Sequence, residues 1–432
     1  MTCLRVALRV QARDGRIAEG WGETPLNVPW AWPGESEYAA RHHALKTFCA
    51  VLTEAWAAWD RYGHPLEVGY DFLEQELPNH WQVFNSKQLG SEMPWLAALL
   101  CCSAFDIALH DAFGCLHGLP TYHTYNESWM NEDLEYFLTP AADAAVDFHK
   151  HFPEHYLEIP GCAFLPVWHL VGVGDNLENV GETSSGSGDD NPGILRDWIR
   201  RDGLKCLKIK LQGTDSAWDY DRILHIGRIA REEGANWLSV DFNGAVNEPE
   251  YVIALLDKLL WEEPDIYGRL LYVEQPFPSD LHRRPIDGHS ISARNSLFMD
   301  ESAHDWRNVL LGRELGWTGV ALKTCKTQTG ALLSLCWAKA HGMPVMVQDL
   351  ANLMLAQLSH LQLGAHARSL MGMESTSMQF CPEASRPEAD RYPDAYQRRN
   401  GIIKIPSLDA PGLGYQIEQI DRLLPEPEMV VE

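Results

Sequence analysis

Positive charge is scarce in this 432-residue chain, which has 35 Lys and Arg residues against 60 Asp and Glu residues. The formal net charge of −25 argues against binding to nucleic acid or to an anionic membrane surface, because both would be repelled. We therefore expect neither kind of partner. Any site for an anionic substrate must be made positive locally, by a metal ion or by lysines.

Other common signals are missing as well. No two cysteines have the C-x-x-C spacing, so the ten cysteines are interpreted as reduced thiols, most of them buried. The eighteen histidines show no metal-binding spacing. The start of the chain is too polar for a signal peptide, and no apolar run approaches a membrane span. The expected location is therefore the cytoplasm.

Strand and helix patterns alternate from residue 166 onward, which is typical of a parallel sheet. Eight short apolar runs are candidate strands, at residues 166–174, 205–211, 237–242, 270–275, 296–300, 319–323, 344–348 and 369–374. The sequence therefore predicts an α/β protein whose residues 166–399 form a (β/α)8, TIM-like barrel.

The rest of the chain predicts a smaller α+β domain over residues 1–165. An Asp14-Gly15 turn between two alternating runs indicates a β-hairpin, and residues 36–60 and 93–118 are predicted helices. Residues 126–165 fit no regular repeat. The tail 400–432 contains one strand and several Gly and Pro turns, and we expect it to return to this first domain.

Three acidic residues recur at the spacing of barrel strands. Asp241, Glu274 and Asp300 each end an apolar run, at separations of 33 and 26 residues, and a barrel uses about 31 residues per βα unit. They should therefore lie at the carboxyl ends of successive strands, where barrel active sites lie. Three converging carboxylates would repel one another without a cation. Oxygen ligands of this kind favour Mg²⁺, with Mn²⁺ as a substitute.

Lysines extend this spacing on both sides. Lys210 precedes Asp241 by 31 residues and Lys323 follows Asp300 by 23 residues. Lys208 and Lys210 are two residues apart and so share one face of a strand. The order along the ring becomes lysines on the second strand, acids on the third to fifth, and a lysine on the sixth. Lysines would then stand on opposite walls of the barrel.

Several motifs in this order resemble the enolase superfamily and, within it, the muconate lactonizing enzyme subgroup. They are Gly20-Trp21-Gly22-Glu23, the helix around Asp106 and Asp111 that runs into Gly118-Leu119-Pro120, Lys208-Ile209-Lys210, Asp241-Phe242-Asn243, Glu274-Gln275-Pro276, Asp300-Glu301-Ser302, Lys323, and Ala410-Pro411-Gly412-Leu413-Gly414. The resemblance covers nearly the whole chain. It implies that the first domain and the tail form a cap over the barrel.

The resemblance also implies a metal site and an activity. Asp241, Glu274 and Asp300 would ligate Mg²⁺, with Asn243 and Glu301 supporting them from behind. The shared reaction of the superfamily removes the proton next to a substrate carboxylate, which gives a metal-stabilised enediolate. The substrate would be a small carboxylate.

Lysines would carry the proton transfer. The resemblance implies that Lys210 and Lys323 act as acid and base on opposite faces of the substrate. Lys208 would help to hold the substrate carboxylate and lower the pKa of Lys210. This lowering is needed because a lysine with the usual pKa of about 10.4 is protonated at neutral pH.

Three interpretations of the activity stay open. A racemase or epimerase is the first. A cycloisomerase or syn-dehydratase, like muconate lactonizing enzyme or o-succinylbenzoate synthase, is the second. A barrel that binds carboxylates without turnover is the third. Gln348 and Asp349 occupy the end of the seventh strand, where the mandelate racemase subgroup has a histidine, which argues against His–Asp chemistry.

The sequence also offers candidate residues for contact with the substrate and candidate segments for a lid over the site. Candidate contacts are Gln348, Asp349, Glu374, Lys326 and Trp30. The resemblance implies a further strand and a mobile lid before the hairpin, whereas this chain opens on the second strand. Residues 24–35, with Trp30 and Trp32, could replace the lid, as could residues 126–165 or 176–193. We also expect a homo-oligomer.

Overall fold

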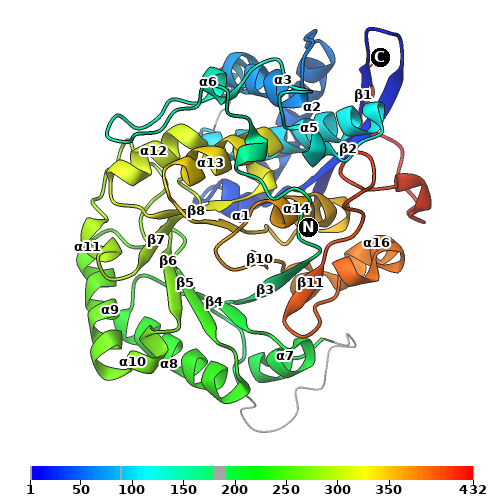
Figure 1. The fold of residues 1–432 in the computed structure, drawn as a ribbon. Helices are drawn as coiled ribbons and strands as arrows, with labels where there is room; N and C mark the ends of the chain where they lie inside the picture. The colour runs from blue at the N-terminus through cyan, green and yellow to red at the C-terminus, as the bar shows by residue number, and fades with distance from the viewer. Residues whose placement is uncertain (1, 88–89, 179–190, 432) are drawn as a thin grey trace.

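The computed structural model describes residues 2–87, 90–178 and 191–431. A closed barrel forms one part, and a two-stranded sheet with several helices forms a cap beside it (Figure 1). The cap touches the carboxyl ends of the barrel strands, because its long helix packs against the segment that directly follows the sixth barrel strand. The cap therefore lies where a barrel enzyme has its active site.

Eight parallel strands form the barrel wall: β3 Phe164–Val171, β4 Cys206–Lys210, β5 Trp237–Asp241, β6 Leu270–Glu274, β7 Ser296–Met299, β8 Gly319–Leu322, β9 Val345–Val347 and β10 Met373–Glu374. Each pairs with the next along the chain, and β10 pairs with β3 to close the ring. The predicted eight-stranded barrel is confirmed, and every predicted strand overlaps one of these.

The register of the barrel sheet sets the height of the strand ends. Lys210 on β4 pairs with Asp241 on β5, and Asp241 pairs with Glu274 on β6. Because each of these residues is the last of its strand, their side chains start from one level of the barrel. The floor beneath them is apolar and aromatic, a cluster that includes Trp168, Tyr272 and Phe298.

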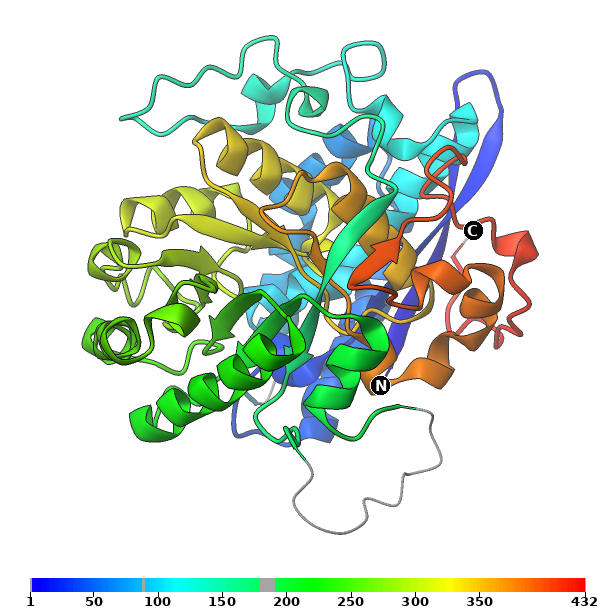
Figure 2. The ribbon, with the colours of Figure 1, turned by 60° about the horizontal axis from the view of Figure 1, so that its bottom comes forward.

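Helices lie outside the ring of strands (Figure 2). They are α7 Leu195–Asp202, α8 Ser216–Glu233, α9 Pro249–Glu262, α10 Pro264–Tyr267, α11 His289–Ser292, α12 Trp306–Glu314, α13 Gln328–Ala340, α14 Met354–His366, α15 Ser377–Phe380 and α16 Arg386–Arg391. Local signals set their ends. Asp215 caps α8 by accepting hydrogen bonds from the backbone of Ala217 and Trp218, and Gly234 ends the helix with a φ of 73°.

The cap consists of β1 Cys3–Gln11, β2 Ile17–Pro25, α1 Val28–Ala31, α2 Tyr38–Ala57, α3 Pro65–Asp71, the π-helical turn η1 Phe72–Glu76, α4 Leu77–Lys87 and α5 Trp95–His117. The predicted hairpin and both predicted helices are confirmed. Residues 126–165 hold the short helix α6 Leu134–Phe137 and irregular backbone that packs against α13 and α14. The ten cysteines are free, and most are buried.

Helix α5 corrects one expectation. By length and composition it is apolar enough to cross a membrane, so the expectation that no run approaches a membrane span is wrong on that criterion. In the protein, 89% of its most apolar window is buried. It lies between the hairpin, α2 and the barrel, and an apolar helix surrounded in this way belongs to the core.

The hairpin lies directly on α5, because glycines face the helix. A Cβ atom at Gly20 would come within 2.1 Å of the Ala112 nitrogen, and one at Gly22 within 1.9 Å of the Ala104 carbonyl oxygen. Asp111 of α5 accepts hydrogen bonds from the backbone nitrogen of Trp21, at 2.8 Å, and from that of Leu413, at 2.6 Å. One carboxylate therefore joins hairpin, helix and tail.

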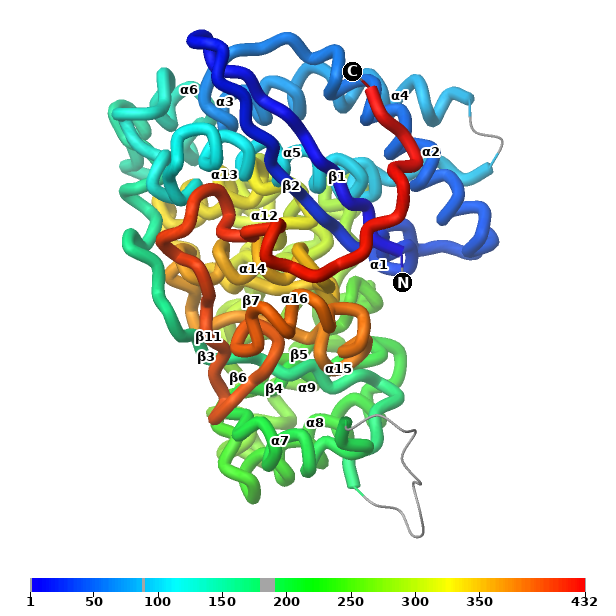
Figure 3. The backbone as a smooth tube through the Cα atoms, turned by 90° about the vertical axis from the view of Figure 1, so that its right-hand side faces the viewer, coloured from blue at the N-terminus to red at the C-terminus, as the bar shows by residue number. Residues whose placement is uncertain are grey.

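The tail contacts both parts of the protein. Its strand β11 Ile402–Lys404 pairs antiparallel with β3 of the barrel, and Gly412 then exchanges backbone hydrogen bonds with Leu119 and Thr121, just after α5. Beyond this point the tail runs past the hairpin and ends beside α2, where Lys46 pairs with Glu428 (Figure 3). The division into domains at residues 165 and 400 stays a prediction.

Gly22→Ala should destabilise the cap, because the new methyl group meets backbone atoms that cannot rotate away. We expect a loss of about 1–3 kcal/mol, measured by thermal or urea unfolding. Gly174→Ala is the matched control, since a Cβ there has nothing within 4 Å. Equal stability of the two variants would show that the hairpin does not depend on close contact with α5.

Candidate active site

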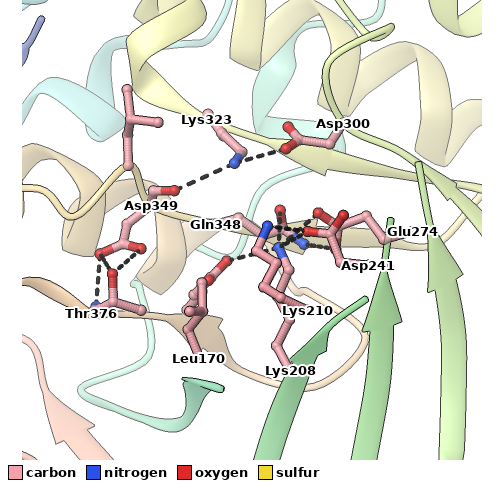
Figure 4. A network of polar contacts seen from close by, with 12 residues as sticks. Leu170, Lys208, Lys210, Asp241, Glu274, Asp300, Lys323, Gln348, Asp349 and Thr376 are labelled. Carbon is pink, nitrogen blue, oxygen red and sulfur yellow. Dashed lines mark hydrogen bonds and ion pairs between the residues drawn. The ribbon is translucent and has the colours of Figure 1, made fainter. Parts of the chain in front are cut away.

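The carboxyl ends of β4 to β8 bring the predicted acids and lysines together (Figure 4). Lys208 and Lys210 lie on β4, Asp241 and Glu274 end β5 and β6, and Asp300 and Lys323 directly follow β7 and β8. The three carboxylates are fully buried, with exposed fractions of 0%, 0% and 1%. Ionised groups buried in this way need cations beside them.

Lys208 occupies the centre of the cluster. Its Nζ lies 2.7 Å from Glu274 Oε1, 3.1 Å from Asp241 Oδ2 and 3.4 Å from Glu374 Oε2. Burial lowers the pKa of Lys208, but these three carboxylates outweigh burial and hold the pKa well above its usual value. The three carboxylates therefore favour the charged form of Lys208.

Lys210 lies two residues beyond Lys208, at the carboxyl end of β4, and contacts Asp241. Its Nζ donates to Asp241 Oδ2 at 2.5 Å and to Asn243 Oδ1 at 2.8 Å. Asn243 also donates from its amide to Glu301 Oε1 at 2.8 Å and from its backbone to Asp241 Oδ1. Asn243 thus hydrogen-bonds to Asp241 and links this carboxylate to Glu301.

Lys323 stands on the opposite side, with Asp300. The distance from Lys323 Nζ to Asp300 Oδ2 is 2.9 Å. Lys326 binds the same residue, at its backbone oxygen and at Oδ1, 3.2 Å away. Burial raises the pKa of Asp300, but Lys323 and Lys326 outweigh it, so the pKa is lowered. Burial lowers the pKa of Lys323 and Asp300 raises it, with a net rise.

Trp30 covers this second side. Its ring lies 5.1 Å from Lys323 Nζ and 5.9 Å from Lys326 Nζ, within the range of a cation–π contact. Asn27 caps the short helix α1 by accepting from the Trp30 nitrogen, which fixes this segment. Trp32 does not share the position, since it is buried in the core of the cap.

The other candidate lids lie elsewhere or outside the described residues. Residues 126–165 bond to helices outside the barrel and to the cap, as where Trp337 of α13 donates to the Thr139 oxygen and Asn131 donates to Glu67 of α3. In the segment 176–193, residues 179–190 fall outside the described part of the chain. Within the described residues of these segments, Trp30 of 24–35 contacts the lysines.

Candidate contacts on the last two strands divide into two kinds. Gln348 belongs to the cluster, accepting from Lys208 at 3.3 Å and donating to Glu274 Oε2 at 2.6 Å. Glu374 also faces Lys208. The Asp349 carboxylate instead accepts the backbone and side-chain hydrogen bonds of Thr376, so it joins two strand ends.

Gln275 has a role that the sequence reasoning missed. Its buried Oε1 accepts from the backbone nitrogens of Asp300 and Ser302 and from the Ser302 hydroxyl. It therefore fixes the turn that carries Asp300. The signal was present in the Glu274-Gln275-Pro276 motif, because a polar residue after a buried strand end needs a partner.

Carboxyl groups outnumber ammonium groups in this cluster. Six are buried, at Asp241, Glu274, Asp300, Glu301, Asp349 and Glu374. The facing lysines are Lys208, Lys210, Lys323 and Lys326. Burial and the neighbouring Asp241 raise the pKa of Glu274, and Glu301 Oε2 is buried without a hydrogen-bond partner. A donor set of buried oxygens with two more carboxyl groups than ammonium groups fits a hard divalent cation.

The expected convergence of the three carboxylates on one point is not found. Among the residues that the structure describes, the acidic or histidine ligand atoms that all lie within 4.8 Å of one another belong to Asp133, Glu135 and His149, in the 126–165 segment. The physical reason is that ammonium groups bind these carboxylates: Lys208 contacts Asp241 and Glu274, and Lys323 contacts Asp300. Asp241 and Glu274 still share one cation, Lys208.

Comparison with known proteins identifies relatives. Residues 194–420 match the family described as enolase C-terminal domain-like, which is more than half of the chain. A curated relative, an L-Ala-D/L-amino acid epimerase from Pedosphaera parvula, is 24% identical over 201 residues. That match covers 45% of this chain and 54% of the relative, so it spans about half the length of that protein.

Solved structures share the whole fold. Muconate lactonizing enzyme from Pseudomonas putida has a TM-score of 0.55 and 17% identity, covering 95% of this chain and 91% of its own. An N-succinyl Arg/Lys racemase from Bacillus cereus has a TM-score of 0.56 and 14% identity, covering 95% and 87%. A dipeptide epimerase from Cytophaga hutchinsonii, complexed with Mg and a dipeptide, has a TM-score of 0.55 and 18% identity, also covering 95% and 87%.

Lys208→Met should strongly destabilise the barrel, because Asp241, Glu274 and Glu374 lose the cation that they share. Removing one partner of a buried ion pair costs about 3–5 kcal/mol, measurable by urea unfolding. The loss should shrink at acidic pH, since burial raises the pKa values of Glu274 and Glu374 and protonation removes the unpaired charges.

Lys205→Met is the control for this prediction. Lys205 lies three residues earlier, is exposed, and donates to the Gly234 carbonyl oxygen, so the change should cost less than about 0.5 kcal/mol. If the two variants unfold alike at every pH, Lys208 does not hold the cluster together.

Proposed function

This chain belongs to the enolase superfamily, and we propose that it is a racemase or epimerase that moves the proton on the carbon next to a substrate carboxylate. The proposal rests on one observation. Lys210 and Lys323 stand on opposite sides of the buried carboxylates, one held by Asp241 and the other by Asp300. A substrate carbon between them would face one amine on each side.

The metal belongs to the proposal as well. Asp241, Glu274 and Asp300 would hold Mg²⁺, or Mn²⁺ in its place. When bound, the ion would supply positive charge to the substrate carboxylate and so make its α-proton more acidic. The surplus of buried carboxyl groups over ammonium groups supports this assignment.

The lysines would transfer the proton directly. To act as a base, Lys210 must release its ion pair with Asp241 and lose a proton. Lys208 remains on Asp241 and Glu274 when this happens, so the two carboxylates keep a cation. Lys210 would keep the proton that it removes, and Lys323, protonated, would donate its own proton to the opposite face from its position beneath Trp30.

A second candidate function is supported by the difference between the two lysines. Lys210 is partly exposed, whereas Lys323 is buried, and Asp300 raises its pKa. A lysine held protonated in this way suits a role as a fixed cation beside the reacting centre. The enzyme would then use one base, as a cycloisomerase or syn-dehydratase does.

Metal binding tests the assignment of the ligands. Calorimetric titration of Mg²⁺ into the metal-stripped protein should show binding, and Glu274→Gln should weaken it by at least about tenfold, as is typical even of residues that only support a metal ligand. Glu135→Gln is the matched control, because Glu135 belongs to the surface cluster with Asp133 and His149. Weakening by Glu135→Gln alone would place the metal at the surface.

Isotope exchange tests the mechanism. Chiral N-acyl amino acids and dipeptides incubated with enzyme and Mg²⁺ in D2O should gain deuterium at the α-carbon. Lys210→Ala should stop exchange of one enantiomer and Lys323→Ala that of the other, each by at least about 10²-fold, as expected for loss of a general base.

Other outcomes separate the alternatives. Loss of all turnover in Lys210→Ala, with mainly weaker binding in Lys323→Ala, would favour the one-base reaction. Unchanged exchange in both variants would rule out both lysines as bases. Binding of the carboxylates by the wild type with no exchange at all would leave a barrel that binds carboxylates without turnover. Lys205→Ala serves as the control.

The oligomeric assembly of the protein and its cellular location are also part of the proposal. We propose a homo-oligomer in the cytoplasm, as expected for a metabolic enzyme acting on a small carboxylate. Size-exclusion chromatography with light scattering measures the assembly, and a monomer at micromolar concentration would contradict it.

A further inference from the structure

The two lysines of the proposed reaction are held in different ways. Lys210 is the last residue of β4, which pairs with β3 on one side and with β5 on the other. Its ammonium group contacts two residues of the barrel, Asp241 and Asn243. Lys323 instead begins the segment 323–329, which leads from the end of β8 into α13. We call this segment the lysine loop, and it packs against helix α5 of the cap.

Thr329, at the end of the lysine loop, is bound directly by α5. The Asp106 carboxylate accepts from the Thr329 nitrogen at 2.8 Å and from its hydroxyl at 2.7 Å. His110, one turn further along α5, contacts the same hydroxyl through Nε2 at 2.9 Å. All three residues are fully buried, and hydrogen bonds in such surroundings are stronger than in water.

Two other residues of the lysine loop also contact the first domain. The Gln328 side chain donates to the hydroxyl of Tyr122, just after α5, at 2.8 Å. The Cys325 side chain is buried in the apolar core of the cap. The loop is therefore attached at three positions, 325, 328 and 329.

The backbone of the lysine loop depends on these attachments. Thr327 has a φ of 74°, a conformation that a β-branched residue rarely adopts. Such a conformation persists where surrounding contacts over-determine it. The contacts of Cys325 and Thr329 with the cap lie on either side of Thr327 and meet this need.

The position of the Lys323 ammonium group follows from the loop. The Lys326 nitrogen donates to the Lys323 carbonyl oxygen at 3.1 Å, and the two ammonium groups meet different carboxylate oxygens of Asp300, at 2.9 Å and 3.2 Å. A shift of the loop would move both groups. A displacement of about 1 Å from a reacting geometry can slow a reaction about 10²-fold.

We propose that Asp106 and Thr329 are positioning residues for Lys323. The cap would hold the lysine loop, and through it the amine on one wall of the site, whereas the barrel alone holds Lys210 on the other wall. This inference rests on the proposed function, because it assigns the cap to proton transfer at one face of the substrate. Loosening the attachment should slow transfer at that face only, a selectivity that a general loss of stability would not produce.

Thr329→Val tests the proposal, because it keeps the shape of the side chain and removes the hydroxyl that Asp106 and His110 share. With chiral substrates and Mg²⁺ in D2O, it should slow α-proton exchange at least about tenfold for the enantiomer that depends on Lys323. Exchange of the other enantiomer should be unchanged. Thr329→Ser keeps the hydroxyl and should restore the wild-type rate. Asp106→Asn, which removes the acceptor of that hydroxyl, should show the selectivity of Thr329→Val.

Glu74→Gln is the matched control. It weakens another contact between cap and barrel, the two hydrogen bonds from Arg307 at 2.8 Å and 3.1 Å, which lie outside the lysine loop. Exchange of both enantiomers should be unchanged in this variant. Equal slowing of both enantiomers by Thr329→Val, slowing of neither, or the same selective loss in Glu74→Gln would overturn the proposal.

Amide hydrogen exchange, followed by mass spectrometry, tests the attachment without substrate or metal. Peptides that cover the lysine loop should exchange faster in Thr329→Val than in the wild type, and peptides that cover β4 should not. Unchanged amide exchange in the lysine loop contradicts the proposal. If the wild type exchanges no α-proton, the proposed function fails. Faster amide exchange confined to the lysine loop would then still support the positioning of Lys323 by the cap.

Discussion

Charge balance inside the barrel mouth is the constraint on which this structure depends. Buried carboxylates are tolerated only with cations and hydrogen-bond donors around them, and Lys208 supplies the central cation. Its ammonium group contacts Asp241, Glu274 and Glu374, which belong to three different strands. The neighbouring contacts follow from the same requirement, since Asn243 serves Asp241 and Gln275 fixes the backbone of Asp300. A site built for charge stabilisation is in this way also a condition for a stable barrel.

The cap reaches this site through one long helix. Helix α5 is joined to the barrel where Asp106 accepts from the nitrogen and hydroxyl of Thr329, at 2.8 Å and 2.7 Å, and where His110 contacts the same hydroxyl. Burial raises the pKa of Asp106 to about 6, although its hydrogen bonds oppose the rise. Because Thr329 follows Lys326 by three residues, the docking of the cap and the position of the lysine loop are coupled. The same cap carries Trp30 to Lys323.

Sequence reasoning predicted the barrel and the elements that carry the site, because both follow from periodicity. Apolar runs that recur at a constant spacing along the sequence identify parallel strands. A charged residue at the end of each run must then lie at the carboxyl-terminal end of the barrel. The distances between side chains, however, do not follow from the spacing of the strands along the sequence. The contacts of Lys208 with three carboxylates and of Lys323 with Asp300 depend on side-chain rotamers, which no spacing encodes. Trp30 and Trp32 looked alike in the sequence, yet one faces the lysines and the other lies in the core. That difference is set by the short helix α1, which the sequence did not reveal.

The two sides of the candidate site share one arrangement, a buried carboxylate between two lysines, and this similarity bears on the reaction. On one side Asp241 is shared by Lys208 and Lys210. If Lys210 moves away, Asp241 still has an ion pair with Lys208. On the other side Asp300 is shared by Lys323 and Lys326. If Lys323 moves away, Asp300 still has an ion pair with Lys326. Each carboxylate thus keeps one lysine as a fixed counter-ion while the other is available to the substrate. Duplicated cations on both walls favour proton transfer at both faces, which a racemase or epimerase needs. A one-base reaction would need the spare lysine on only one wall.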